Sequence, residues 1–376
     1  MVAAVTILAL AGCRSRSAVV SSQSTSVGQW QGVSEPWLTP APAERKVFLL
    51  TNTGGKGHYM SLSSVAFYNA RQGWACGWCG VFKTSDGGFT WRRVKPRGSW
   101  CQVAMTGPHE IWLLADPHPH HKPAILWHSV DNGKIWRQEL PGKLYYWFGI
   151  GDLYARGPVI WAVNDQPGGL SYYSRDDGKT WQTTNFGRLF DQGWCIAVPG
   201  EPTHGGGYVV YVLGLSGHQP QLVKSLDGGK TWKSIPLPPH SSPEVATHSM
   251  FFITGRKGWI GCTGGKVLFT RNGGRTWQQR NLPTKETLQA LWFDQLGRGF
   301  AAVSNNSGSG AAVYQTFNGG KNWNVVMAGH KHIGAFYSIS GHLWAVGTTG
   351  GSGQDIVAIL KPGMLDSTTA SPAGNP

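Results

Sequence analysis

The octapeptide SLDGGKTW at residues 225–232 is one of six closely related segments in this chain of 376 residues. Each has Ser or Thr first, Asp or Asn two positions later, Gly two after that, and Trp three further on. The copies are TSDGGFTW at 84–91, SVDNGKIW at 129–136, SRDDGKTW at 174–181, SLDGGKTW at 225–232, TRNGGRTW at 270–277 and TFNGGKNW at 316–323. The acidic or amide positions are spaced by 45, 45, 51, 45 and 46 residues. A period near 45 with short strands is typical of β-propeller blades.

The motif predicts a tight hairpin turn between the third and outermost strands of a blade. Asp or Asn bonds backbone amides across such a turn, and Gly supplies the positive φ that the turn needs. The Trp starts the next strand and covers the hairpin with a large apolar face. We therefore predict a structural role, not a catalytic one, for Asp86, Asp131, Asp176, Asp227, Asn272 and Asn318, and for Trp91, Trp136, Trp181, Trp232, Trp277 and Trp323.

A second element recurs upstream of the boxes and extends the predicted ring. It opens a second strand at Gly73-Trp74, Ile111-Trp112, Ile160-Trp161, Gly258-Trp259, Gly299-Phe300 and Leu343-Trp344. The last copy has no box after it, and the strand KVFLLT at 46–51 precedes the first blade without a partner. We expect this N-terminal strand to close the last blade, because closure removes free sheet edges. The sequence thus predicts an all-β, seven-bladed β-propeller with Asp-box hairpins, one domain over residues 36–362.

Composition and charge narrow the classes of function. Hydrophobic residues make up 40% of the chain and charged residues 14%, which suits a large core and not a disordered chain. No apolar run reaches the roughly 18 residues of a membrane-spanning helix. The net charge of +14 indicates acidic partners: proteins, anionic lipid headgroups, glycans or nucleic acid.

The N-terminus looks like an export signal. Residues 1–12 are apolar over a signal-peptide length, and Leu10-Ala11-Gly12-Cys13 resembles the lipobox of bacterial lipoproteins, which implies lipidation of Cys13. No Lys or Arg precedes Cys13, a departure that suggests a misassigned start codon. Residues 13–35 are predicted to be a flexible tether and 363–376 a disordered tail. We expect a monomer in the cell envelope, lipid-anchored to the outer face of the cytoplasmic membrane or its equivalent.

The boxes are similar to the Asp-box (BNR) repeats of sialidases, sortilin-like receptors and some glucanases. The fuller repeats GWIGCTGGKVLFTRNGGRTW at 258–277 and GWACGWCGVFKTSDGGFTW at 73–91 resemble the photosystem II assembly and stability factor family and related bacterial lipoproteins. The resemblance covers essentially the whole propeller. It implies a non-catalytic scaffold that binds a membrane-protein subunit during assembly, with a basic surface implicated.

The blade-to-blade loops carry the residues that we predict to bind the partner. These loops share a face with those between second and third strands, and that face carries ligands in most propellers, by analogy. Basic and aromatic side chains interleave there, which suits an acidic protein segment or an anionic glycan. The candidates are Lys95, Arg97, Trp100, Lys143, Tyr146, Trp147, Arg188, Lys285 and Lys331. The box face carries a further ring, Lys134, Lys179, Lys230, Arg275 and Lys321, which we interpret as a product of repetition and solubility.

Two other clusters are interpreted as non-functional. His118, His120 and His121, with Asp116, could ligate Zn, Ni or Cu, but they lie in one Pro-broken loop, so no metal site or other cofactor is predicted. The CxxC at Cys76 and Cys79 lies in a strand-rich blade, not at a helix N-terminus, which argues against redox catalysis. In an oxidising compartment the sequence allows two alternative disulfides, Cys76–Cys79 or Cys79–Cys101. It assigns no pairing to Cys195 and Cys262.

The alternative hypothesis is a glycan-binding protein or a sialidase-like glycosidase on the same fold. Such an enzyme needs two facing carboxylates, or a Tyr nucleophile with an Arg cluster. No such pair is identifiable by spacing among the acids outside the boxes on the candidate face, which are Asp116, Asp165, Asp191, Glu244 and Glu286. No nucleic-acid recognition motif is present, and export would remove that partner. We therefore predict neither catalysis nor nucleic-acid binding.

Overall fold

The computed structural model of the chain describes most of the repeat region. The described residues are 17–18, 45–50, 62–77, 80–94, 99–116, 125–140, 152–163, 171–184, 186, 189, 192–200, 207–216, 219–239, 249–304, 311–329, 331–349 and 355–360. Apart from the short 3-10 turn η1 (Thr263–Gly265), the elements in these ranges are strands. No helix in them is long and apolar enough to cross a membrane.

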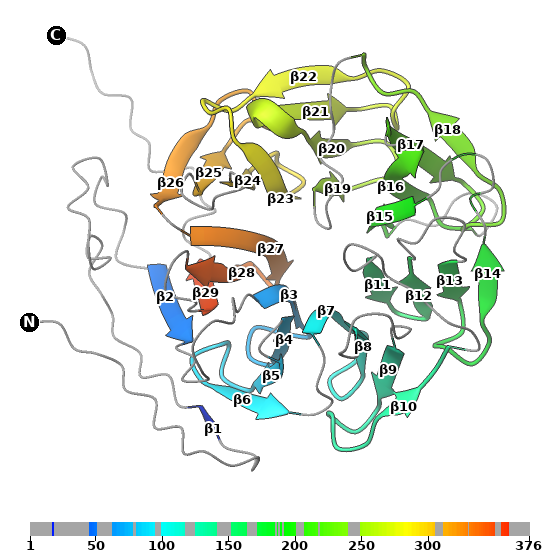
Figure 1. The fold of residues 1–376 in the computed structure, drawn as a ribbon, viewed down its shortest axis with the longest axis vertical. Coiled ribbons are helices and arrows are strands. Elements are labelled where there is room, and N and C mark those ends of the chain that lie inside the picture. Colours follow the sequence, from blue (N-terminus) through cyan, green and yellow to red (C-terminus); the bar gives the residue numbers. More distant parts are fainter. Residues whose placement is uncertain are drawn as a thin grey trace, which may run out of the picture.

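Seven antiparallel sheets surround a central axis (Figure 1), and in each of the six blades described next the first of the four strands lies innermost. Blades 1 to 3 are β3 (Leu62–Phe67), β4 (Gly73–Gly77), β5 (Gly80–Thr84) and β6 (Trp91–Val94); β7 (Ser99–Met105), β8 (Ile111–Asp116), β9 (Ile125–Ser129) and β10 (Arg137–Gln138); and β11 (Leu153–Arg156), β12 (Val159–Ala162), β13 (Ser171–Ser174) and β14 (Gln182–Thr184). Blades 4 to 6 are β15 (Gln192–Ala197), β16 (Val210–Ser216), β17 (Gln219–Ser225) and β18 (Lys233–Ile235); β19 (Met250–Phe252), β20 (Gly258–Gly261), β21 (Lys266–Thr270) and β22 (Gln278–Asn281); and β23 (Thr287–Phe293), β24 (Gly299–Ser304), β25 (Ala312–Thr316) and β26 (Asn324–Ala328). The recurring aromatic dipeptides lie at the start of the second strands, as predicted.

The remaining sheet combines strands from both ends of the chain and has no Asp box. The prediction of seven blades is therefore wrong: the structure has six blades and this composite sheet. Six blades consist of four consecutive strands closed by an Asp box. The composite sheet instead combines β27 (Lys331–Ile339), β28 (His342–Thr349) and β29 (Asp355–Leu360) with β2 (Arg45–Leu50) from the other end of the chain. Arg45 pairs with Leu360 and Leu50 with Asp355 in antiparallel register. Because its outermost strand does not follow its third strand, this sheet has no turn that a box could close.

The N-terminal segment adds a strand where the sequence predicts only tether. Ser17–Ala18 (β1) pairs antiparallel with Trp91 and Arg92 of β6, which makes the first sheet five-stranded. The rest of the predicted tether, Cys13 and the tail after Leu360 lie outside the described residues.

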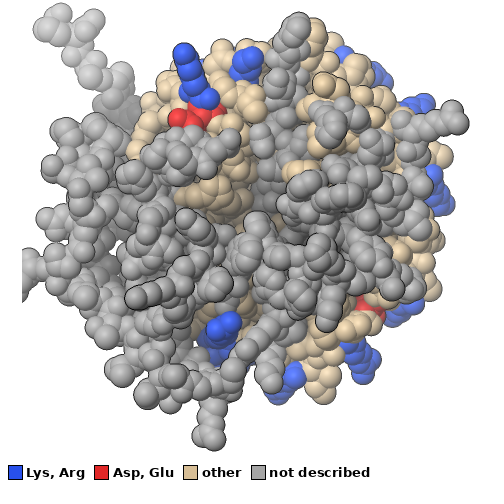
Figure 2. Space-filling model, viewed as in Figure 1, with Lys and Arg blue, Asp and Glu red and all other residues tan. Residues whose placement is uncertain are grey.

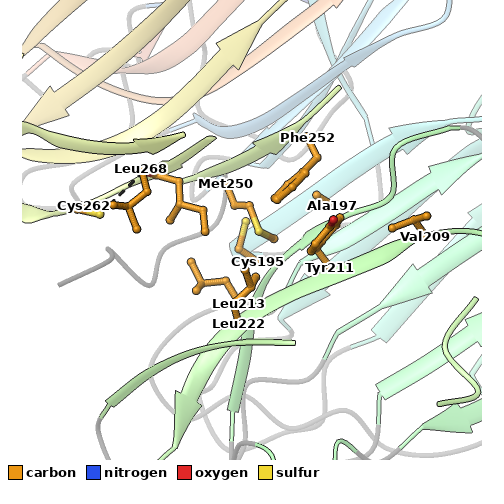
Figure 3. Packing of buried hydrophobic residues seen from close by; sticks show 11 residues of the cluster. Cys195, Ala197, Val209, Tyr211, Leu213, Leu222, Met250, Phe252, Cys262 and Leu268 are labelled. Carbon is orange, nitrogen blue, oxygen red and sulfur yellow. Dashed lines mark hydrogen bonds between the residues drawn. The ribbon is translucent and has the colours of Figure 1, made fainter. Parts of the chain in front are cut away.

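The hydrophobic core lies between sheets, and each described cluster joins two neighbours. Figure 3 shows the cluster between blades 4 and 5, where Tyr211 of β16 stacks on Phe252 of β19 with ring centroids 3.8 Å apart. Cys195, Met250 and Cys262 fill the same interior (Figure 3). Burial of such apolar surface contributes roughly 25 cal/mol per Å², so each blade depends on its neighbours for stability.

An aromatic side chain on the second strand locks each blade to the box of the next. A Cβ on Gly133 would overlap Trp74, and one on Gly229 would overlap Trp161. The box Trp then packs edge-on against the same ring, as in the Trp74–Trp136 pair at 5.8 Å. The box glycines are therefore required by close approach as well as by their positive φ.

Candidate functional surfaces

The Asp boxes use their polar groups inside their own turns. In blade 4 the Ser225 hydroxyl donates to Asp227 Oδ1 at 2.7 Å and accepts the Gly229 amide at 2.7 Å. Asp227 also accepts the Thr231 amide at 2.9 Å and the Thr231 hydroxyl at 2.6 Å. Carboxylates saturated in this way serve poorly as general acids.

Hydrogen bonding lowers the carboxyl pKa values in the boxes. The side-chain and backbone bonds from Thr180, followed by the Ser174 hydroxyl, lower the pKa of Asp176 to about 2. Partial desolvation, the largest single influence at Asp227, raises its pKa, but the bonds from Thr231, Ser225 and Lys230 outweigh it and the net shift is strongly downward. The box Asp residues are thus ionised throughout the physiological range.

Several cations on the box side cap backbone carbonyls of the next blade. Lys83 Nζ donates to the Asn132 carbonyl at 3.0 Å, and Lys224 Nζ donates to the Gly255 carbonyl at 3.2 Å. Arg175 donates to the carbonyls of Asp227 and Gly228, both at 2.8 Å, and Arg280 donates to the carbonyl of Gly319. Part of the positive charge is therefore structural.

A basic groove opens between blades 4 and 5 at the box end. Its volume is about 590 Å³. The lining residues are Val209, Lys224, Leu226, Lys233, Ile235, Gly255, Arg256, Asn272, Gly273 and Arg275, with no carboxylate among them. Burial, and then repulsion from Arg275 and Arg256, lower the pKa of Lys224. An anion in this groove would relieve that repulsion.

Sequence reasoning missed this groove, because its cations come from different parts of the repeat. Lys224 lies on the third strand of blade 4, Lys233 on the outermost strand, and Arg256 in a loop of blade 5. Only Arg275 belongs to the repeated box position. Blade 4 has Tyr211 where the other second strands have Trp or Phe. The recurring dipeptide therefore did not reveal the second strand of blade 4, which is β16.

Most predicted partner-binding residues fall outside the described part of the chain. These are Lys95, Arg97, Lys143, Tyr146, Trp147 and Arg188. Trp100 lies in β7 and Lys331 in β27, but their side chains are not described. Lys285 is described and exposed, in the loop between β22 and β23.

The loop that carries Lys285 is held by backbone bonds to a neighbouring turn. The amide of Gly265 donates to the Glu286 carbonyl at 2.8 Å, and the amide of Leu282 donates to the Gly265 carbonyl at 2.7 Å. These bonds fix the backbone around Lys285 on the face opposite the boxes. On the face seen in Figure 2, the visible Lys and Arg side chains lie mainly around the margin.

The predicted metal and cysteine clusters are largely outside the described ranges. His118, His120 and His121 are among the undescribed residues, and the described ones contain no group of three or more metal-ligating side chains. Of the cysteines, Cys76, Cys195 and Cys262 are buried. Cys79 and the side chain of Cys101 are not described, so the predicted disulfides stay predictions.

The acids considered for a glycosidase are also mostly undescribed. Asp165, Asp191 and Glu244 lie outside the described ranges, and Asp116 ends β8 without a described side chain. Glu286 is described, beside Lys285 on the loop opposite the boxes.

The boxes, the stacked sheets and the interlocking aromatics define the chain as a β-propeller of the Asp-box class. Residues 172–183 match the BNR/Asp-box repeat, and residues 201–351 match the family model described as photosynthesis system II assembly factor YCF48. Over residues 201–351 the chain is thus similar to photosystem II assembly factors.

Two curated relatives match in sequence over part of the chain. One is the photosystem II assembly lipoprotein Ycf48 of Synechococcus sp. (strain CC9902), 29% identical over 111 residues, which cover 29% of this chain and 32% of that protein. The other is the chloroplastic photosystem II stability/assembly factor HCF136 of Oryza sativa subsp. japonica, 26% identical over 132 residues, which cover 35% of this chain and 29% of that protein. The matched stretches thus span about a third of each relative.

Solved structures show the same fold at low identity. YCF48 from Cyanidioschyzon merolae superposes with a TM-score of 0.61 at 16% identity, over 84% of this chain and 99% of that one. A YCF48 structure bound to a D1 peptide gives 0.58 at 18% identity, over 88% and 99%. A GH74 xyloglucanase from Xanthomonas campestris gives 0.58 at 14%, over 80% and 54%. Because binding proteins and a hydrolase share this fold, the fold alone does not decide the function.

Proposed function

We propose that this protein is a non-catalytic, lipid-anchored propeller outside the cytoplasm that captures an acidic segment of a membrane protein during its assembly. The observation that carries the proposal is the match of residues 201–351 to the assembly-factor model. It is supported by the solved YCF48 of similar fold that holds a peptide of D1. The net charge of +14 suits an acidic partner.

The proposed partner surface is the face opposite the boxes. On the box face the carboxylates and cations such as Lys83 and Arg175 are engaged within the ring. The blade-to-blade loops that the sequence predicts for that face contain Lys95, Arg97, Lys143 and Arg188, with aromatic residues between them in the sequence. Basic and aromatic groups together favour specific capture of an acidic chain.

In-cell crosslinking tests the capture. A tagged chain is crosslinked mildly and extracted in detergent, and the proteins bound to it are identified by mass spectrometry. We expect one or two membrane proteins in stoichiometric amounts, and their loss on Arg97→Glu with Arg188→Glu. Lys179→Glu, on the box face, is the matched control and leaves capture unchanged. Capture that survives both reversals refutes the placement on this face.

The lipid anchor is tested separately. The lipobox ending at Cys13 supports it, and a curated relative is named as a lipoprotein. Cys13→Ser should release the protein from the membrane pellet in high salt, where surface electrostatics are screened. Retention of the Cys13→Ser protein under those conditions contradicts the anchor.

A further inference from the structure

We propose that the box face is a membrane-docking surface that binds an anionic phospholipid bilayer. The box face consists of the six box turns and the loops between the first and second strands of the same blades. Backbone bonds hold the two sets together: the amides of Gly87, Gly273 and Gly319 donate to the carbonyls of Arg71, Arg256 and Gly297 at 2.7 to 2.8 Å. All these tips therefore lie at one end of the ring. The inference does not depend on the proposed partner or on the lipid anchor.

Large apolar side chains protrude from these tips. Leu296 is 76% exposed, Ile135 66%, Val130 63% and Leu226 58%. Tyr68 and Phe317 are also exposed on the same face. Exposed apolar groups cost free energy in water, and a single one needs no explanation. Six at the tips of one face form a set that a bilayer interface would take up by shallow insertion.

Cations lie beside the apolar tips. Lys134 is next to Ile135, and Lys230, Arg275 and Lys321 hold the same place in other boxes. All four are exposed. Lys134, Lys230 and Lys321 thus share their box turns with exposed apolar residues, which repetition of the motif does not explain. Alternating cations and apolar groups are the pattern of proteins that lie on anionic membranes.

Most of the described acids of this face have hydrogen-bond or ion-pair partners. The box Asp side chains accept bonds inside their turns, and Asp294 pairs with Arg298 at 2.5 Å. Glu110 contacts His128 Nε2 at 3.1 Å. The box carboxylates stay ionised, but Lys and Arg outnumber Asp and Glu on the described box turns and the loops beside them, so the surface potential of this face is positive.

The groove between blades 4 and 5 supplies a place for a headgroup. Lys233, Arg256 and Arg275 converge there around exposed Leu226, and Lys224 lies at the inner wall. A phosphate that enters the groove meets several cations, while the apolar rim meets the acyl boundary. The groove would therefore favour lipids with a net negative headgroup over zwitterionic ones.

A bilayer fits the arrangement better than a protein partner does. A stable protein interface has a contiguous apolar centre, whereas Tyr68, Val130, Leu226 and Leu296 belong to four different sheets around the ring. A planar bilayer accepts separate insertions at the rim of a disc without a complementary shape. The surface charge adds attraction of about fivefold in binding for each Lys or Arg at the surface.

Vesicle flotation tests the proposal with the full chain carrying Cys13→Ser, so that no acyl chain contributes. The probes are vesicles of phosphatidylcholine alone and of phosphatidylcholine mixed with phosphatidylglycerol, at low and high salt. We expect binding only to the mixed vesicles, weakened by salt. Lys230→Glu with Arg275→Glu should lower the partition coefficient by tenfold or more. Leu226→Ser with Leu296→Ser should lower it about tenfold.

Matched controls separate docking from general charge and hydrophobicity. Lys285→Glu reverses a charge on the opposite face, and Val325→Ser removes an apolar group, 42% exposed, on outer strand β26. Both should change partitioning less than about twofold. The Lys, Arg, Leu and Val residues that are substituted are all exposed, and thermal unfolding of each variant checks that the fold is retained. Absence of phosphatidylglycerol-dependent binding at low salt overturns the proposal and leaves an acidic protein as the occupant. Equal weakening by the controls overturns it as well.

Discussion

The six Asp-box blades and the composite sheet occupy equivalent places in one ring but are closed by different means. In a box blade, a turn of a few residues joins the third and outermost strands. In the composite sheet, β2 and β29 come from opposite ends of the chain and pair through an antiparallel backbone ladder (Figure 1). Local turns make each blade a repeat that the sequence reveals, whereas ring closure has to overcome the loop-closure entropy of the whole chain.

The joints differ as well. The composite sheet gives an aromatic to blade 1, since Trp344 Nε1 donates to the Gly87 carbonyl at 3.0 Å. The composite sheet has no box turn that could receive the aromatic side chain of blade 6. Phe300 of blade 6 instead faces Phe336 of the composite sheet, with ring centroids 6.2 Å apart. The box thus forms a hairpin turn and also receives the aromatic side chain of the preceding sheet; we call this contact the socket.

The largest expected effect comes from breaking the closing joint. Trp344 is fully buried and stacks on Phe67 at 3.8 Å. Trp344→Ala should lower the free energy of unfolding by about 3–5 kcal/mol. Trp344→Phe keeps a ring there but loses the bond to Gly87, and should cost less. Urea unfolding measures both. A Trp344→Phe variant as stable as the native protein would contradict the role of the indole bond, and equal costs for the two variants would contradict the role of ring stacking.

Breaking a socket in a regular blade comes next. Gly229 has φ +96, and a Cβ there would overlap Trp161. Gly229→Ala should therefore cost about 3 kcal/mol through strain and overpacking together. Gly264→Ala is the matched control, because Gly264 has φ +69 but open space around it. It should cost only about 1 kcal/mol, the left-handed penalty. Similar losses in thermal unfolding at both sites would mean that backbone conformation alone requires the box glycine.

The four Asp boxes and the two Asn boxes differ in their response to acid. The folded-state pKa of Asp176 is about 2, below its ordinary value of 3.8, so its contribution to stability is full above pH 3.8 and is lost as pH falls through about 2. Asp176→Asn with Asp227→Asn should flatten stability against pH between pH 4 and 2. The native Asn272 box shows that Asn is accepted, since its amide donates to Thr276 at 2.8 Å. Chemical unfolding across this range gives the slope, and an unchanged slope would contradict the depressed pKa values.

The smallest expected effect on stability comes from one position at which the boxes differ. Blade 2 has Ile135 where Thr180 and Thr231 donate hydroxyls to the Asp of their boxes. Ile135→Thr should add that bond to Asp131 and raise the free energy of unfolding slightly, since the bond would form where the turn is exposed to water. Thr231→Val should lower it by a similar amount. Thermal unfolding of both variants checks the pair, and a destabilised Ile135→Thr would contradict the assignment.

The sequence by itself determined the repeat, the position of each box turn and the strand that closes the ring, because these depend on local chemistry. Ser or Thr, Asp or Asn, Gly and Trp at fixed offsets specify a turn wherever they occur. The excess of basic over acidic residues was equally visible. Ring closure by β2 was predictable from an unpaired strand at one end of the chain and a missing one at the other.

Only the tertiary structure showed which side chains of one blade contact the next blade. The contact of Trp161 with the box of the following blade joins residues far apart in sequence, so the box motif alone describes a hairpin and not a joint. The groove that holds Lys224, Arg256 and Arg275 likewise forms because blade packing brings together side chains from different repeats. Local turns are specified by neighbours in the chain, but surfaces are specified by neighbours in space.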